Sequence, residues 1–176
     1  CHPITPLLVY VPLLCVLYAY GITQTELSLP ALAGYTAAGV FAWTLTEYWL
    51  HRTVFHFVRN IPAIETLHRR IHGVHHEFPN DMTRIVFPPA PSLGLASVIF
   101  AVVYMLCGPV VSVPVMGGVI IGYLWYDMTH WWIHAGRPRS AWGRLIRHNH
   151  LSHHFKDHGK RFGVTSPLWD YVFRTM

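Results

Sequence analysis

The chain has 176 residues, of which 52% are hydrophobic, 14% aromatic and only 12% charged. This length allows one domain, and the composition is too apolar for an ordinary soluble protein, so we expect an integral membrane protein. Three widely spaced cysteines exclude a disulfide framework and a zinc-finger spacing. The formal charge of +5 favours attraction to anionic lipid headgroups over nucleic-acid binding, because no nucleic-acid-binding module is visible.

Four apolar stretches follow one another, at residues 4–22, 31–51, 92–107 and 110–134. A membrane-spanning helix needs about 20 apolar residues to cross a hydrocarbon core about 30 Å thick, and the first, second and fourth stretches meet this requirement. The third would reach only about 24 Å, so it must extend through residues 89–91 or enter the membrane without crossing it. Turns at residues 21–30 and at Cys107-Gly108-Pro109 would join the four stretches into two hairpins.

The pattern therefore predicts an all-α integral membrane protein with four transmembrane helices, or three and one short one, in hairpins at residues 4–51 and 90–134. All thirteen Lys and Arg residues lie in residues 52–84 and 137–174, which the positive-inside rule places in the cytosol. Residues 52–89 and 135–176 would form a cytosolic helical cap, and residues 1–176 a single domain. No Lys or Arg precedes the first apolar run, so no signal peptide is expected, and a start at Cys1 suggests that an N-terminal extension is missing.

Fourteen histidines stand against eight acidic residues, and eleven of them fall in short clusters within or beside the basic segments. Neutral imidazole is the commonest nitrogen ligand of iron, copper and zinc, and eleven candidates exceed the need of one ion, so the clusters predict a di-metal site. The predicted ligands are His51, His56, His68, His72, His75, His76, His130, His134, His150, His153 and His154. The remaining three, His2, His148 and His158, are predicted not to bind metal.

Helical spacing supports this ligand set. In a helix over residues 65–77 the four histidines share one arc of about 100°, and the clusters after residue 129 likewise share helix faces, whereas His148 points away. His51 and His56 lie about 140° apart on a straight helix, so both can bind metal only if the helix ends or bulges between them.

Two carboxylates lie on the faces of predicted ligands, inside apolar stretches where an unpaired charge would be costly. Asp127 lies one turn before its nearest predicted ligand, and Glu47 lies four residues before His51. We interpret each carboxylate as an acceptor for the outer N–H of a ligand histidine. The alternatives are a surface arginine as the partner of Asp127, and Arg52 or Arg59 as the partner of Glu47.

A ligand set of imidazoles alone leaves a metal pair highly charged and electrophilic, which favours reductive activation of O2 over a purely structural role. The competing interpretation from another class is a non-catalytic metal carrier. Carriers usually place polar or ionisable residues midway through their membrane helices, whereas residues 11–17 are apolar here.

With these residues the chain resembles the histidine-box membrane oxygenases of the fatty acid hydroxylase and sterol desaturase superfamily, over about residues 46–175. Several segments look specifically like fatty acid 2-hydroxylases: residues 51–56 (HRTVFH), 67–76, 81–89 (DMTRIVFPP), 126–130 (YDMTH), 162–166 (FGVTS) and 169–173 (WDYVF). The histidine boxes are common to the superfamily, whereas the segments around Pro88 and Trp169 narrow the resemblance.

The resemblance implies O2-dependent hydroxylation at C2 of a long fatty acyl chain, free or within a sphingolipid, at two iron ions that zinc can replace in a purified protein. It also implies membrane lipid as a partner and a cytosolic metal site, at the endoplasmic reticulum of a eukaryote or the inner membrane of a bacterium. Eukaryotic relatives often carry a fused cytochrome b5 domain, and only residues 1–50 precede the first box here. Electrons would therefore come from a separate carrier such as cytochrome b5 or ferredoxin. The alternative within the superfamily is oxidation of a sterol or carotenoid.

Overall fold

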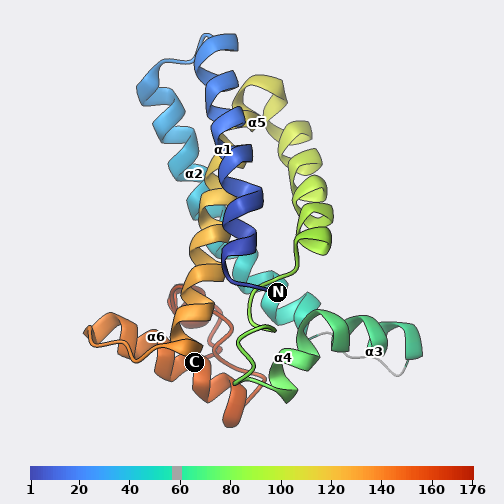
Figure 1. Ribbon diagram of the computed structural model, residues 1–176. Helices are drawn as coiled ribbons and strands as arrows, with labels where there is room; N and C mark the ends of the chain where they lie inside the picture. The colour runs from blue at the N-terminus through green and yellow to red at the C-terminus, as the bar shows by residue number, and fades with distance from the viewer. Residues whose placement is uncertain (57–60) are drawn as a thin grey trace. The chain divides into compact units, whose positions relative to one another are not determined.

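The computed structural model describes residues 1–56 and 61–176, and this part of the chain is helical with no strand (Figure 1). It divides into two compact units. The first, which we call the apolar unit, comprises residues 4–43 and 87–125, and the second, which we call the histidine unit, comprises residues 1–3, 44–86 and 126–176. Helices α2 (Leu29–Trp49) and α5 (Pro89–Ala135) contribute to both units.

The apolar unit contains α1 (Ile4–Gln24), most of α2 and most of α5. Helix α5 consists of two helical segments that meet at Gly108, where φ of 74° and ψ of 174° leave the helical region. The tight turn predicted at this glycine is therefore confirmed. The first segment begins at Pro89, so the third apolar stretch does extend through residues 89–91 and reaches about 28 Å by residue 107.

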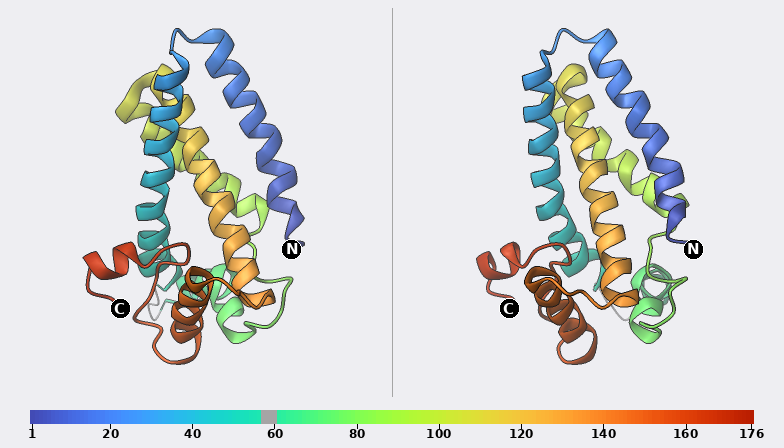
Figure 2. Two further views of the ribbon diagram at one scale, coloured as in Figure 1. Left: turned by 90° about the vertical axis from the view of Figure 1, so that its left-hand side faces the viewer. Right: turned by 60° about the vertical axis from the view of Figure 1, so that its left-hand side comes forward.

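The helices of the apolar unit run side by side (Figure 2) and approach closely where glycines face backbone. A Cβ on Gly39 of α2 would lie 2.0 Å from the carbonyl oxygen of Val115 in α5, so a larger residue would separate these helices. By length and composition, two helices of the described chain could cross a membrane, α1 and α5. Helix α2 has 21 residues, as α1 does, but polar residues such as Thr36 and Glu47 make it less apolar.

The histidine unit is built from short helices and irregular segments. In chain order the short helices are η1 (Leu50–Phe55), α3 (Pro62–His68), η2 (Arg69–Gly73), α4 (Val74–Glu77), α6 (Ala141–Phe155) and α7 (Leu168–Val172). Ser140 caps α6 by accepting a hydrogen bond from the backbone N–H of Gly143 at 3.1 Å. Both η1 and η2 are π-helices. Because η2 covers residues 69–73, the prediction of a continuous α-helix over residues 65–77 is wrong there.

Candidate metal centre

Ten of the eleven predicted ligands come together in two groups of five in the histidine unit. Within each group the candidate ligand atoms all lie within 4.8 Å of one another. Group 1 consists of His51, His56, His72, His76 and His153. Group 2 consists of His75, His130, His134, His150 and His154. The two groups are the arrangement expected of a di-metal site.

The local helix geometry explains why these side chains converge. The π-helix η1 covers the interval between His51 and His56, and i→i+5 spacing brings residues five apart onto one face, as the predicted bulge required. The π-helix η2 lies between His68 and His75, so these two residues do not share the helix face that they would share on a regular α-helix. As a result His68 lies outside both groups, and its role as a ligand stays a prediction.

The rings of each group point their Nε2 atoms at one another. In group 1 the Nε2 atoms of His51 and His72 are 3.1 Å apart, and those of His72 and His76 are 2.9 Å apart. In group 2 the closest Nε2 pairs are also 2.9–3.0 Å apart. Two nitrogens at this separation can both lie at a metal–imidazole bond length of about 2.0–2.1 Å from one ion placed between them, because twice that length exceeds their separation.

Hydrogen bonding between the rings does not account for this arrangement. His51 donates its Nδ1–H to the carbonyl oxygen of Phe162 at 2.6 Å, so its Nε2 carries a lone pair. His72 would then have to offer its single Nε2 proton to His51 and to His76 at once. A metal ion, in contrast, accepts all of these lone pairs together.

The same conflict arises in group 2. The Nε2 of His150 lies 2.9 Å from that of His134 and 3.0 Å from that of His154. A neutral His150 has either one proton or one lone pair at Nε2, so this atom would have to serve both neighbours in the same hydrogen-bonding role. Both groups therefore fit a bound metal ion.

The ligand candidates are neutral and ready to bind metal. Burial, followed by the charge of neighbouring imidazoles, lowers the pKa of His56 and His75 to about 3. Burial lowers the pKa of His153 to about 4. The pKa of further ligand candidates is lowered mainly by burial as well, namely His72, His76, His150 and His154. Metal binding at neutral pH thus needs no proton to be removed from these rings.

Carbonyl groups behind the rings fix two ligands of group 1. Besides the bond from His51 to Phe162, His153 donates its Nδ1–H to the carbonyl oxygen of Lys160 at 2.6 Å. Such partners set the tautomer and the orientation of a ligating ring. These carbonyls could not be predicted from the sequence, because a backbone group carries no sequence signal.

Two buried carboxylates hold the loop at residues 162–165 that presents the carbonyl of Phe162. Asp170 accepts hydrogen bonds from the backbone N–H of Phe162 and of Gly163, each at 2.9 Å. Glu47 accepts from the backbone N–H of Val164 and of Thr165 at 2.8 and 2.9 Å. The carboxylates thus act on the ligand through the loop.

Glu47 therefore plays a different part from the one predicted. Its side chain contacts the loop, while His51 donates its Nδ1–H to the carbonyl oxygen of Phe162, so Glu47 does not accept the outer N–H of His51. Of the alternative partners, Arg52 donates to the hydroxyl of Tyr48 at 2.9 Å, and Arg59 lies outside the described residues.

The remaining predicted positions are placed as follows. Asp127 is fully buried in α5, and its link to a ligand histidine stays a prediction. His2, His148 and His158 are exposed and lie outside both groups, although the ring centre of His158 is 5.0 Å from that of His76. Asp170 is a site residue that the sequence analysis did not single out, although it lies in the segment at residues 169–173.

The chain is similar to known fatty acid hydroxylases over the residues that form this site. The model of the family described as fatty acid hydroxylase matches residues 36–175. The chain belongs to the fatty acid hydroxylase family. It is 36% identical to the Dihydroceramide fatty acyl 2-hydroxylase FAH2 of Arabidopsis thaliana, over 96% of this chain and 70% of that protein. It is also 36% identical to the human Fatty acid 2-hydroxylase, over 78% of this chain and 38% of that protein.

A solved structure of full-length Scs7p, in which only the hydroxylase domain is visible, matches with a TM-score of 0.92 and 30% identity. The match covers 99% of this chain and 66% of that chain. The chain thus spans 38% to 70% of the length of these three relatives. Family membership and the candidate membrane helices α1 and α5 together identify an integral membrane protein.

Proposed function

We propose that this hydroxylase-family protein carries out O2-dependent hydroxylation at C2 of long-chain fatty acyl groups, free or within a ceramide, at a pair of iron ions. The observation that carries the proposal is the convergence of ten Nε2 atoms into two groups of five. The proposed site of hydroxylation, C2, and the proposed substrate class are taken from relatives whose names specify 2-hydroxylation of fatty acids or of dihydroceramide acyl chains.

Bound iron would supply the reductive activation of O2, and the described residues would supply its ligands and surroundings. Group 1 would hold one ion and group 2 the other. The five imidazoles of each group would hold the ion as neutral ligands and leave its positive charge uncompensated. The loop at residues 162–165 would keep His51 and its ion in place.

The reaction also defines what else the protein needs. Converting R–H and O2 to R–OH and H2O consumes two protons and two electrons beyond those that the acyl chain provides. We propose that a separate one-electron carrier supplies the electrons. Membrane lipid would surround the apolar unit and deliver the acyl substrate.

The proposed topology has four membrane-crossing segments: α1, α2 and the two segments of α5. The restriction of all Lys and Arg to residues 52–84 and 137–174 supports a cytosolic position for the histidine unit. Cys107, a free and exposed cysteine next to the Gly108 turn, provides the test. In a Cys1→Ser/Cys15→Ser background, an impermeant maleimide should label Cys107 from the non-cytosolic side; labelling from the cytosolic side would contradict the topology.

The decisive test of the activity is lipid mass spectrometry. Expression in a host without 2-hydroxylated lipids should produce 2-hydroxy fatty acids, and growth under 18O2 should place one heavy oxygen atom in the hydroxyl group. A His72→Ala/His150→Ala variant removes a ligand from each group and should yield none. Iron-loaded protein that receives electrons and still forms no hydroxylated acyl chain would refute the proposal.

A further inference from the structure

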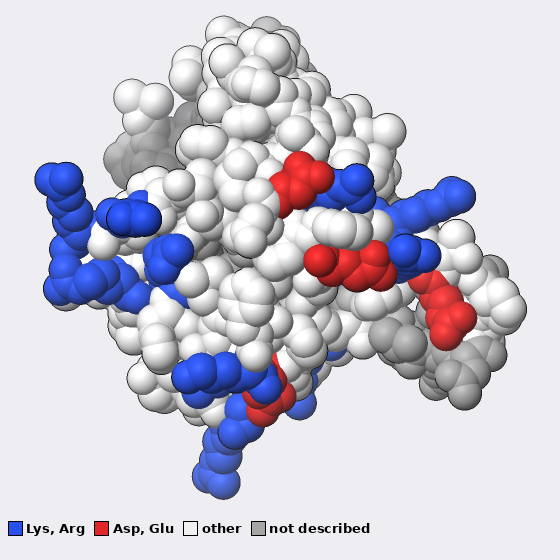
Figure 3. All heavy atoms as spheres, turned by 60° about the horizontal axis from the view of Figure 1, so that its bottom comes forward, with Lys and Arg blue, Asp and Glu red and all other residues white. Residues whose placement is uncertain are grey.

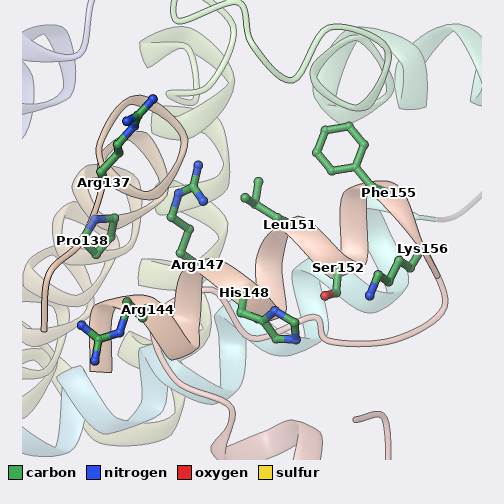
Figure 4. Close-up of a pocket in the computed structure, with 9 residues that line it drawn as sticks. All are labelled: Arg137, Pro138, Arg144, Arg147, His148, Leu151, Ser152, Phe155 and Lys156. Carbon is green, nitrogen blue, oxygen red and sulfur yellow. The ribbon is translucent and has the colours of Figure 1, made fainter. Parts of the chain in front are cut away.

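A basic groove lies on the side of α6 that faces away from the metal ligands. The groove has a volume of about 540 Å³ and is lined by nine residues (Figure 4): Arg137, Pro138, Arg144, Arg147, His148, Leu151, Ser152, Phe155 and Lys156. With 100° per residue, the groove residues of α6 centre about 150° from the face that carries His150, His153 and His154. One helix therefore presents ligands on one face and the groove on the other.

The charge of the groove is unbalanced. Four of the nine lining residues are Arg or Lys and none is acidic, although Asp157 follows Lys156 in the sequence. The ion pairs found in the described chain join Arg69 to Glu77 and Arg84 to Asp81, so none of them involves a groove cation. Arg144 and Arg147 instead donate hydrogen bonds to the backbone carbonyls of Arg139 and Ile133, which leaves their charge without a carboxylate partner. Figure 3 shows Lys and Arg side chains gathered on one side of the displayed face without an acidic side chain among them.

The dimensions and chemistry of the groove suit a protein surface better than a single phosphate. From Arg144 to Lys156 the cations extend over about 18 Å of helix, whereas one lipid phosphate contacts one or two of them. Apolar side chains lie among the cations, and Phe155 is 65% exposed. Arginine mixed with aromatic side chains is typical of protein interfaces.

We infer that this groove docks an acidic one-electron carrier protein that reduces the metal site. This inference rests on the proposed hydroxylation, which consumes two external electrons per turnover. A carrier bound in the groove would be separated from the ligand rings by about one helix diameter, some 10–12 Å. Helix α6, which carries both groove residues and the ligand candidates His150 and His153, would then lie between the carrier and these rings.

Charge reversal in the groove tests the inference on the iron-loaded full chain in nanodiscs. The probes are a reduced soluble cytochrome b5 haem domain and a reduced plant-type ferredoxin, both acidic. Arg144→Glu should lower the second-order rate of carrier oxidation about tenfold at low ionic strength and weaken its salt dependence. Arg144→Lys should retain most of the rate. Arg174→Glu makes the same change in net charge outside the groove and should oxidise both carriers at the wild-type rate.

Two further measurements distinguish failure of the proposed hydroxylation from failure of the docking inference. Photoreduced deazaflavin bypasses the groove and should support equal hydroxylation in wild type and in Arg144→Glu. If it supports none in the wild type, the proposed function fails. If it does, but Arg144→Glu oxidises the carriers normally, the docking inference is overturned. It is also overturned if the loss appears only in nanodiscs containing phosphatidylglycerol and not in phosphatidylcholine alone, because the groove would then be a lipid site.

Discussion

Replacement of Asp170 by asparagine tests whether the carboxylates behind the loop control the metal site. Asp170 is 1% exposed, and its Oδ1 accepts from the N–H of Phe162 and from the hydroxyl of Thr175, while its Oδ2 accepts from the N–H of Gly163. Asparagine keeps one acceptor and turns an N–H2 group toward a backbone donor. Hydrogen bonds to charged groups contribute about 1.5–3 kcal/mol each, so the variant should lose about 2–4 kcal/mol of stability.

The loss should be accompanied by a selective loss of metal. The loop carries the carbonyl that orients His51, and groups of this kind typically change metal affinity about 10- to 100-fold. After dialysis against a chelator, Asp170→Asn should therefore retain close to one metal ion per chain, the ion of group 2, where the wild type retains two. Elemental analysis measures the metal, and tryptophan fluorescence follows thermal unfolding.

Asp157→Asn is the matched control, because Asp157 accepts a backbone N–H from Gly159 at 2.9 Å but is exposed. It should keep both ions and nearly the wild-type stability. If Asp170→Asn retained metal and stability as Asp157→Asn does, the loop would not position the ligand, and the reasoning from its hydrogen bonds would be wrong.

Three further outcomes are expected. His72→Ala should lose metal from group 1, whereas His148→Ala should retain two ions by elemental analysis, because His148 belongs to neither group. Burial holds the pKa of His56 and His75 below the usual 6.5, so the unfolded chain binds more protons at pH 5, and the thermal midpoint of the metal-free protein should fall as pH falls from 7 to 5. Metal removal should accelerate amide hydrogen exchange at residues 50–55 more than in α1, since only the former lie among the ligands.

Much of the site could be predicted from the sequence because metal ligation restricts residue type and spacing. Imidazoles four apart on an α-helix, such as His130 and His134, need no tertiary information to be recognised as a pair. The spacing of five between His51 and His56 required the helix to end or to bulge between them if both bind metal, and the π-helix η1 occupies that interval.

The division of the ligands between two groups could not be predicted in this way. His75 and His76 are adjacent in sequence but belong to different groups, and His153 and His154 likewise separate. Which ring joins which group depends on how α4, α6 and η1 pack against one another. The position of His68 outside both groups was not evident either, because the sequence carries no composition signal for the π-helix η2 that follows it.

The two π-helices link the fold to the chemistry. A π-turn is rare in helices and is often found at functional sites, so its occurrence in both η1 and η2 needs a local cause. In η1 the cause is that His51 and His56, five residues apart, must lie on one face to reach the same group. The loop at residues 162–165 contacts η1 through the hydrogen bond from His51 to Phe162. The two carboxylate partners of this loop, Glu47 and Asp170, lie in separate helices. The segment around Trp169 thus has a physical role as well as a family signature. Its Asp170 holds the loop whose Phe162 carbonyl orients His51, a ligand candidate on the π-helix η1.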